Sequence, residues 1–183
     1  MNTPVNTRYT ATAKTLHWLI AVLIFGMLGL GFYMTGLDLS PTKLQIYSWH
    51  KWVGVTVFVL VVVRLAWRIT HRPPALPQHM APIERIAAHA GHHLLYVLMF
   101  AIPLTGWLMS SAKGVPTVWF GVLPLPDLLD KDKELGNLLA TVHKTLNFGM
   151  AGLVFIHAGA ALKHHLIDRD DVLARMLPML KKP

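Results

Sequence analysis

Four apolar stretches, each long enough to cross a lipid bilayer, limit this chain to an architecture of membrane-spanning helices. The bilayer core offers the backbone no hydrogen bonds, so a single segment that crosses it must be an α-helix. The expected spans lie at about residues 15–36, 47–69, 83–111 and 137–167. We therefore expect an all-α fold, a transmembrane four-helix bundle, in which residues 1–183 form one domain.

The composition is also that of a membrane protein. Hydrophobic residues make up 54% of the 183 residues and charged residues only 14%, whereas soluble domains are about a quarter charged. The chain has no cysteine, which excludes disulfides, iron–sulfur ligation and covalent attachment of haem. The net charge of +8 does not indicate a nucleic-acid partner, because much of the basic excess lies beside the expected spans.

Basic residues are distributed unevenly between the two ends of the spans. The N-terminal segment, the loop after the second span and the C-terminal tail, with the span ends beside them, contain 11 of the 17 lysines and arginines. Cytoplasmic segments of membrane proteins carry such an excess. Since four spans return the chain to its starting side, we expect both the N- and the C-terminus in the cytoplasm.

Histidines in the expected spans fall at two depths. His143 and His157, at opposite ends of the last span, are 14 residues apart, which is about 21 Å along a helix and close to four turns. Both imidazoles therefore leave the same helix face. The alternating direction of the spans places His50 at the outer depth of His143, and His17 at the inner depth of His157. The sequence thus predicts an outer and an inner imidazole pair.

Two imidazoles from different helices at one depth can hold the iron of a porphyrin from both sides. A single histidine in a span is often only a packing or hydrogen-bonding residue, but two depth-matched pairs are harder to explain in that way. A structural zinc site would need about four ligands at one point. We therefore predict two bis-histidine haem b groups stacked across the membrane, an arrangement suited to electron transfer.

Other polar residues belong to the inner depth. Arg64 follows His50 by 14 residues and so lies on the same face, where it is a candidate partner for a haem propionate. The alternative is an interfacial arginine whose charge reaches the headgroups. His89 and His92, with His93 beside them, begin the third span. They are candidates for alternative haem ligation, quinone contact or proton transfer, and otherwise they are ordinary interfacial residues.

The longest connection, residues 112–139, contains the apolar and proline-rich VWFGVLPLPDLL and then the charged DKDKE. We predict that the first part is an interfacial or re-entrant segment, with Trp119 and Phe120 at headgroup depth, where aromatic residues are enriched. The second part is expected in water.

Four motifs carry a resemblance to a known family: LHWLI around His17, HKWVGVTVFVLVVVRL in the second span, AHAGHHLLYVLMFAIPLTGW in the third and VHKTLNFGMAGLVFIHAGAALKHH in the fourth. They are similar to those of the bacterial cytochrome b561 family, and the resemblance covers nearly the whole chain. That family consists of four-span, di-haem cytochromes of the inner membrane, related to the cytochrome b subunits of formate dehydrogenases and hydrogenases. The resemblance implies haem ligation by His17, His50, His143 and His157, and electron exchange with ubiquinone.

One branch of that family oxidises superoxide and passes the electron to ubiquinone, so the resemblance makes superoxide the leading substrate of an oxidoreductase. Lys51 and Lys144 each directly follow an outer histidine, and they would steer a small anion towards the outer haem. They would otherwise bind propionates or lipid headgroups. The leading alternative function is a cytochrome b anchor subunit that relays electrons for a separate dehydrogenase or a periplasmic redox partner. A non-redox metal transporter and a structural membrane protein are two further alternatives.

Overall fold

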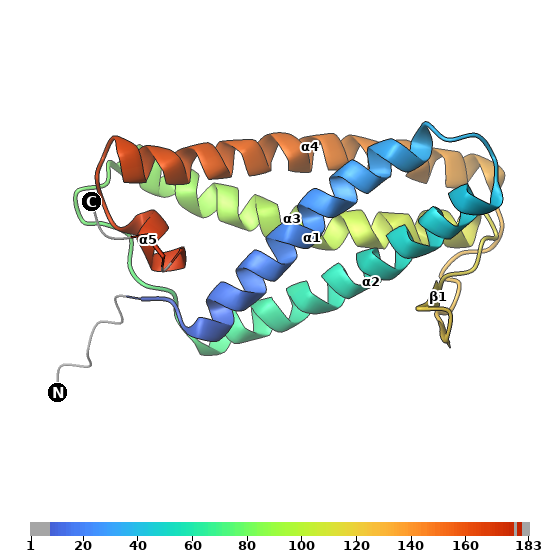
Figure 1. Cartoon of the computed structure of the whole chain (residues 1–183), viewed down its shortest axis with the longest axis horizontal. Coiled ribbons are helices and arrows are strands. Elements are labelled where there is room, and N and C mark those ends of the chain that lie inside the picture. The colour runs from blue at the N-terminus through green and yellow to red at the C-terminus, as the bar shows by residue number, and fades with distance from the viewer. Residues whose placement is uncertain (1–7, 178, 181–183) are drawn as a thin grey trace.

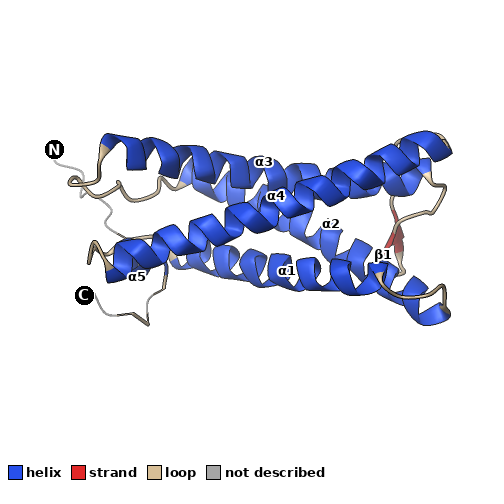
Figure 2. Cartoon of the chain, turned by 90° about the horizontal axis from the view of Figure 1, so that it is seen from above, coloured by secondary structure: helices blue, strands red, loops and turns tan. Residues whose placement is uncertain are grey.

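The computed structural model describes residues 8–177 and 179–180, and most of them are helical. Four long helices form the molecule: α1 (Ala11–Thr35), α2 (Pro41–Thr70), α3 (Pro82–Ala112) and α4 (Lys133–Leu166). Figure 1 shows them lying lengthwise along one another, and in Figure 2 α4 runs obliquely across the bundle. All four are long and apolar enough to cross a membrane, so that prediction is confirmed.

Three small elements complete the described chain. The two-residue strands β1 (Val118–Trp119) and β2 (Leu123–Pro124) pair antiparallel and form a hairpin between α3 and α4. A short helix, α5 (Val172–Met176), follows α4 at the other end of the bundle (Figure 1). The terminal residues 1–7 and 181–183, which belong to the segments predicted to be cytoplasmic, lie outside the described residues.

Polar caps start α1 and α2 before the apolar stretch inside each of them. The Thr10 hydroxyl accepts a hydrogen bond from the amide of Ala13 before α1. The Ser40 hydroxyl accepts one from the amide of Lys43, and Pro41 occupies the first turn of α2. α2 therefore begins at residue 41 rather than 47, because the cap lies well before the apolar run.

The buried core is small and lies where the four helices meet. Its members are Ile20 of α1, Val57 and Val61 of α2, Leu98 and Met99 of α3, and Met150 of α4. Large apolar side chains elsewhere point outwards; Phe155 and Ile156 of α4, for example, are 73% and 68% exposed. An apolar exterior around a thin core is expected for helices whose surroundings are lipid rather than water.

Candidate functional site

The outer histidine pair lies near the hairpin end of the bundle. His50 of α2 and His143 of α4 are both half-buried, with ring centroids 6.3 Å apart and ring planes at 72°. A cavity of about 530 Å³ surrounds them, and its wall is mostly apolar. Cofactor sites commonly have volumes of about 300–1,000 Å³ and apolar walls, so this cavity is of a suitable kind.

The inner pair lies further along α4. His17 of α1 and His157 of α4 have ring centroids 6.2 Å apart and ring planes at 62°. His92 of α3 approaches the same place, with its ring centroid 5.3 Å from that of His157. The structure therefore brings together the residues of both predicted pairs, and it adds a third imidazole at the inner level.

The spacing of both pairs fits a single metal ion between two imidazoles. A ring nitrogen binds a first-row metal ion such as zinc at about 2.0–2.1 Å, and the ring centroid lies about 1 Å further away. Two rings on opposite sides of one ion therefore have centroids about 6 Å apart. Two further observations fit a metal-bound group at the outer pair. The pair lines the cavity, and the buried Nδ1 atom of His50 has no hydrogen-bond partner among the described residues.

α3 supplies no predicted ligand, but it holds the ring of His143. The Nδ1 atom of His143 is 3.0 Å from the carbonyl oxygen of Ile102 and 3.2 Å from the hydroxyl of Thr105. A carbonyl can only accept, so Nδ1 carries the proton and Nε2 is left free to bind a metal. Gly106 allows this approach, because a Cβ atom there would lie 3.2 Å from Cε1 of His143.

Arg64 lies at the inner level, as predicted from its spacing. Its Nε donates to the hydroxyl of Tyr96 at 3.1 Å, and its Nη1 donates to the carbonyl of Ala13 at 3.0 Å. The guanidinium group is also close enough to His17 and His157 to interact with them electrostatically. It therefore joins α1, α2 and α3 and places a fixed positive charge beside the inner pair.

The two histidines predicted for quinone contact or proton transfer differ in position. His92 is half-buried, and its Nδ1 lies 2.6 Å from the carbonyl oxygen of Ala88. His89 is exposed one turn earlier in α3, and His93 beside it is exposed as well. Of the two predicted residues, the ring contacts therefore link His92 to the inner pair.

Three lysines line the outer cavity, and they differ in what they bind. Lys51 is half-buried, and its ammonium group donates to the carbonyl oxygens of Val115 and Pro116, both at 3.1 Å. Lys144 and Lys113 are exposed at the cavity. Lys113 is not among the site residues predicted from the sequence. Its position at the end of the third span, level with the outer histidines, is the signal that could have found it.

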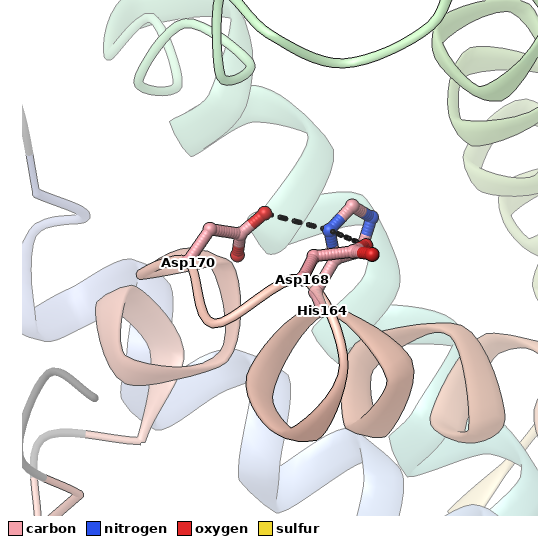
Figure 3. Close-up of side chains that lie close together, drawn as sticks. All are labelled: His164, Asp168 and Asp170. Carbon is pink, nitrogen blue, oxygen red and sulfur yellow. Dashed lines mark hydrogen bonds and ion pairs between the residues drawn. The ribbon is translucent and has the colours of Figure 1, made fainter.

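An ionic cluster closes the inner end of α4 (Figure 3). The Nδ1 atom of His164 is 2.7 Å from an Asp170 oxygen and 3.2 Å from an Asp168 oxygen. Lys163 binds Asp168 at 2.8 Å and Glu84 of α3 at 2.7 Å, and its hydrogen bond lowers the pKa of the Asp168 carboxyl. His164, Asp168 and Asp170 have atoms of metal-ligating type within 4.8 Å of one another, but hydrogen bonds and ion pairs already account for the arrangement.

Comparison with known proteins identifies the family. The model of the family described as prokaryotic cytochrome b561 matches residues 8–179. The chain belongs to the prokaryotic cytochrome b561 family. Cytochrome b561 homolog 2 of Escherichia coli K12 is 36% identical over 96% of this chain and 93% of its own length. Cytochrome b561 homolog 1 of the same organism is 30% identical over 95% of this chain and 99% of its own length.

A relative of lower identity carries a functional name. The probable superoxide oxidase CybB of Yersinia pestis is 25% identical over 93% of this chain and 96% of its own length. The family predicted from the sequence motifs is thus confirmed, and this cytochrome b561 is a b-type membrane cytochrome of electron transfer. Haem b is the cofactor that the family implies, and the histidine pairs described above fit it.

Proposed function

We propose that this cytochrome b561 holds two b haems, each between imidazoles from two helices. His50 and His143 ligate the outer haem, and His17 and His157 ligate the inner one. The observation that carries this proposal is the nearly equal centroid spacing of the two pairs, 6.3 and 6.2 Å, at two levels along α4. Haem held by these four histidines would supply reversible one-electron transfer.

The residues around the pairs have distinct roles in this proposal. Ile102 and Thr105 hold the proton on Nδ1 of His143, so that Nε2 faces the cofactor. Arg64 neutralises a propionate at the inner level, where two hydrogen bonds hold its guanidinium group in position. His92, beside the inner pair, and the exposed His89 one turn away provide a quinone contact or a route for protons from the surface.

We further infer that the outer level faces the periplasm and that both termini are in the cytoplasm, with the bundle in the bacterial inner membrane. The excess of basic residues at the inner ends of the spans supports this orientation. Single electrons would then move between the periplasmic side and the quinone pool, through a protein whose partners are lipid, a quinone and an electron donor.

Superoxide is the proposed donor and ubiquinone the proposed acceptor. The name of the Yersinia pestis relative supports this choice, and so do the three lysines at the outer cavity, whose positive field attracts a small anion. Two superoxide ions lose one electron each and become dioxygen. The two electrons, with two protons, convert one ubiquinone to ubiquinol.

The haem assignment is tested by counting haems in single variants of the purified protein. We expect two haems per wild-type chain and a b-type α band after reduction with dithionite. His50→Ala should remove the outer haem alone, and His157→Ala the inner haem alone. His93→Ala, an exposed histidine outside both pairs, is the matched control and should retain both. The assignment is wrong if either ligand variant keeps two haems, or if one change removes both from a folded protein.

The donor is tested by mixing the purified protein with superoxide in a stopped-flow instrument, with and without ubiquinone. Rapid haem reduction, followed by ubiquinone-dependent reoxidation, is expected. Lys144→Gln should slow the reduction and weaken its dependence on salt, because screening acts on the steering charge. Reduction only after addition of a co-purifying dehydrogenase would instead support the anchor-subunit function.

A further inference from the structure

The β1–β2 hairpin is fastened to the flank of α2. Figure 1 shows it beside α2, set back from the end of the bundle. The indole nitrogen of Trp119 donates to the carbonyl of Trp52 at 3.2 Å and lies 3.3 Å from the hydroxyl of Thr56. The indole of Trp52 donates in return to the carbonyl of Val118. The hairpin is thus held by reciprocal bonds to one stretch of helix.

This stretch of α2 lies at membrane depth. Trp52 and Thr56 follow His50 by two and six residues, so they are about 3 and 9 Å further towards the inner end of the helix. If, as the proposed function has it, the bilayer is centred between the two histidine levels, a hydrocarbon core of about 30 Å extends roughly 4–5 Å beyond the outer level. Both residues therefore lie inside the outer edge of the hydrocarbon core, so the hairpin bound to them is not surrounded by water alone.

The outward side of the hairpin is apolar. Phe120, Val122 and Leu123 are 56%, 83% and 51% exposed, and residues 115–126 include no charged side chain. In water this surface would be unfavourable, and it continues the apolar exterior of α2, where Val59 and Val62 are also exposed. Lipid is the partner that such a continuous surface fits.

The turn of the hairpin places an aromatic ring in a backbone conformation that disfavours it. Phe120 and Gly121 have φ angles of 51° and 73°, in the left-handed region. Glycine or asparagine is usual there, and a bulky residue is a genuine outlier. Phe120 is nevertheless exposed, with its ring 5.7 Å from that of Trp52. A strained position that presents an aromatic side chain outwards indicates a contact that the ring makes with its surroundings.

The backbone of the hairpin limits how deep it can lie. Non-helical backbone is costly in hydrocarbon, because unpaired amides find no partner there. Gly121 and Val122 donate to the carbonyls of Val118 and Trp119, and Leu125 donates to that of Thr117. Three prolines in this stretch, at 116, 124 and 126, have no amide hydrogen to satisfy. We propose that the hairpin binds outer-leaflet lipid, from the headgroup boundary, where aromatic residues are enriched, to the upper acyl chains beside Trp52 and Thr56.

The absence of cysteine permits a direct test, because a single introduced cysteine can be labelled alone. Val122→Cys carries an environment-sensitive fluorophore, and the full-length holoprotein is reconstituted in vesicles of phosphatidylethanolamine and phosphatidylglycerol. Asp130→Cys, exposed in the charged part of the same connection, is the aqueous control. Val62→Cys, exposed on α2, is the lipid control. Leu123→Cys repeats the measurement at a second hairpin position.

The label at Val122 should emit at a shorter wavelength than the label at Asp130. Lipid that carries a nitroxide near the headgroup should quench the Val122 label at least twofold more than the Asp130 label. Aqueous iodide should quench the Val122 label less than the Asp130 label. A nitroxide deeper in the acyl chains should quench the Val62 label more strongly than the nitroxide near the headgroup does. The lipid proposal is overturned if the labels at Val122 and Leu123 both behave like the Asp130 label in protein with its full haem content. That result would leave the proposed function intact. Loss of haem in the unsubstituted protein would instead count against the proposed function.

Discussion

The two histidines of the outer level are held differently. Nδ1 of His143 has two hydrogen-bond partners on α3, whereas Nδ1 of His50 is buried without a partner among the described residues. An acceptor at Nδ1 makes a ligating imidazole more basic, which favours the oxidised metal. The outer haem potential should therefore depend on α3, although that helix ligates nothing in the proposed arrangement.

Thr105→Val removes one of the two oxygen atoms next to Nδ1 of His143. We expect both haems to remain and the midpoint potential of the outer one to rise, because its imidazole becomes less basic. A hydrogen bond contributes about 1 kcal/mol, which for a one-electron couple is roughly 40 mV. Potentiometric titration of the α band measures the shift. Thr141→Val, which removes an exposed hydroxyl two residues before His143, should change neither potential; equal potentials in both variants would contradict the role of Thr105.

At the scale of elements, the approach of α3 to α4 depends on a glycine. A Cβ atom at Gly106 would lie 3.2 Å from Cε1 of His143, whereas one at Gly26 of α1 would meet nothing within 4 Å. Gly106→Leu should therefore displace the His143 ring and remove the outer haem while the inner haem remains. Gly26→Leu, on the face of α1 opposite His17, should keep both. Haem counting distinguishes the two variants, and retention of both haems in Gly106→Leu would contradict this account.

The four helices follow directly from the sequence because lipid solvation requires long apolar runs. The histidine pairs follow as well, since their depths depend only on spacing along helices and on alternating direction. The role of Gly106 does not follow, because it depends on where α3 crosses α4. The hairpin was expected near the interface, but not with the Trp119 indole bound to α2. Its turn places Phe120 where local preference predicts glycine or asparagine, so this position depends on contacts outside the turn, among them the ring of Trp52.

At the scale of the whole molecule, Lys163 of α4 joins Glu84 of α3 to Asp168 after α4. The pKa of Asp168 is lowered from 3.8, mainly by the hydrogen bond from Lys163. Because the pKa is lower in the folded protein, the ionised carboxylate gives its full stabilisation at pH values above its pKa in the unfolded chain. This stabilisation is lost as the pH falls through the folded-state pKa. Asp168→Asn should thus lower the apparent melting temperature at neutral pH, and the difference from wild type should shrink below about pH 4.

Differential scanning fluorimetry of the two proteins in detergent measures this difference across the pH range. Asp130→Asn, an exposed carboxylate at the opposite end of the bundle, is the control and should melt like wild type. A difference between Asp168→Asn and wild type that is as large at about pH 3 as at pH 7 would show that the effect does not come from the ionised carboxylate.

The orientation of the whole bundle decides which haem meets which compartment. Asp130→Cys, in the connection between α3 and α4, should react with a membrane-impermeant maleimide in intact cells. Arg72→Cys, in the loop between α2 and α3, should react only after the membrane is made permeable, because basic segments remain in the cytoplasm. The reverse pattern would leave the histidine pairs unchanged but would turn the lysine-lined cavity towards the cytoplasm. A periplasmic donor would then be impossible at that cavity, so this measurement separates the source of the electrons from the residues that hold the haems.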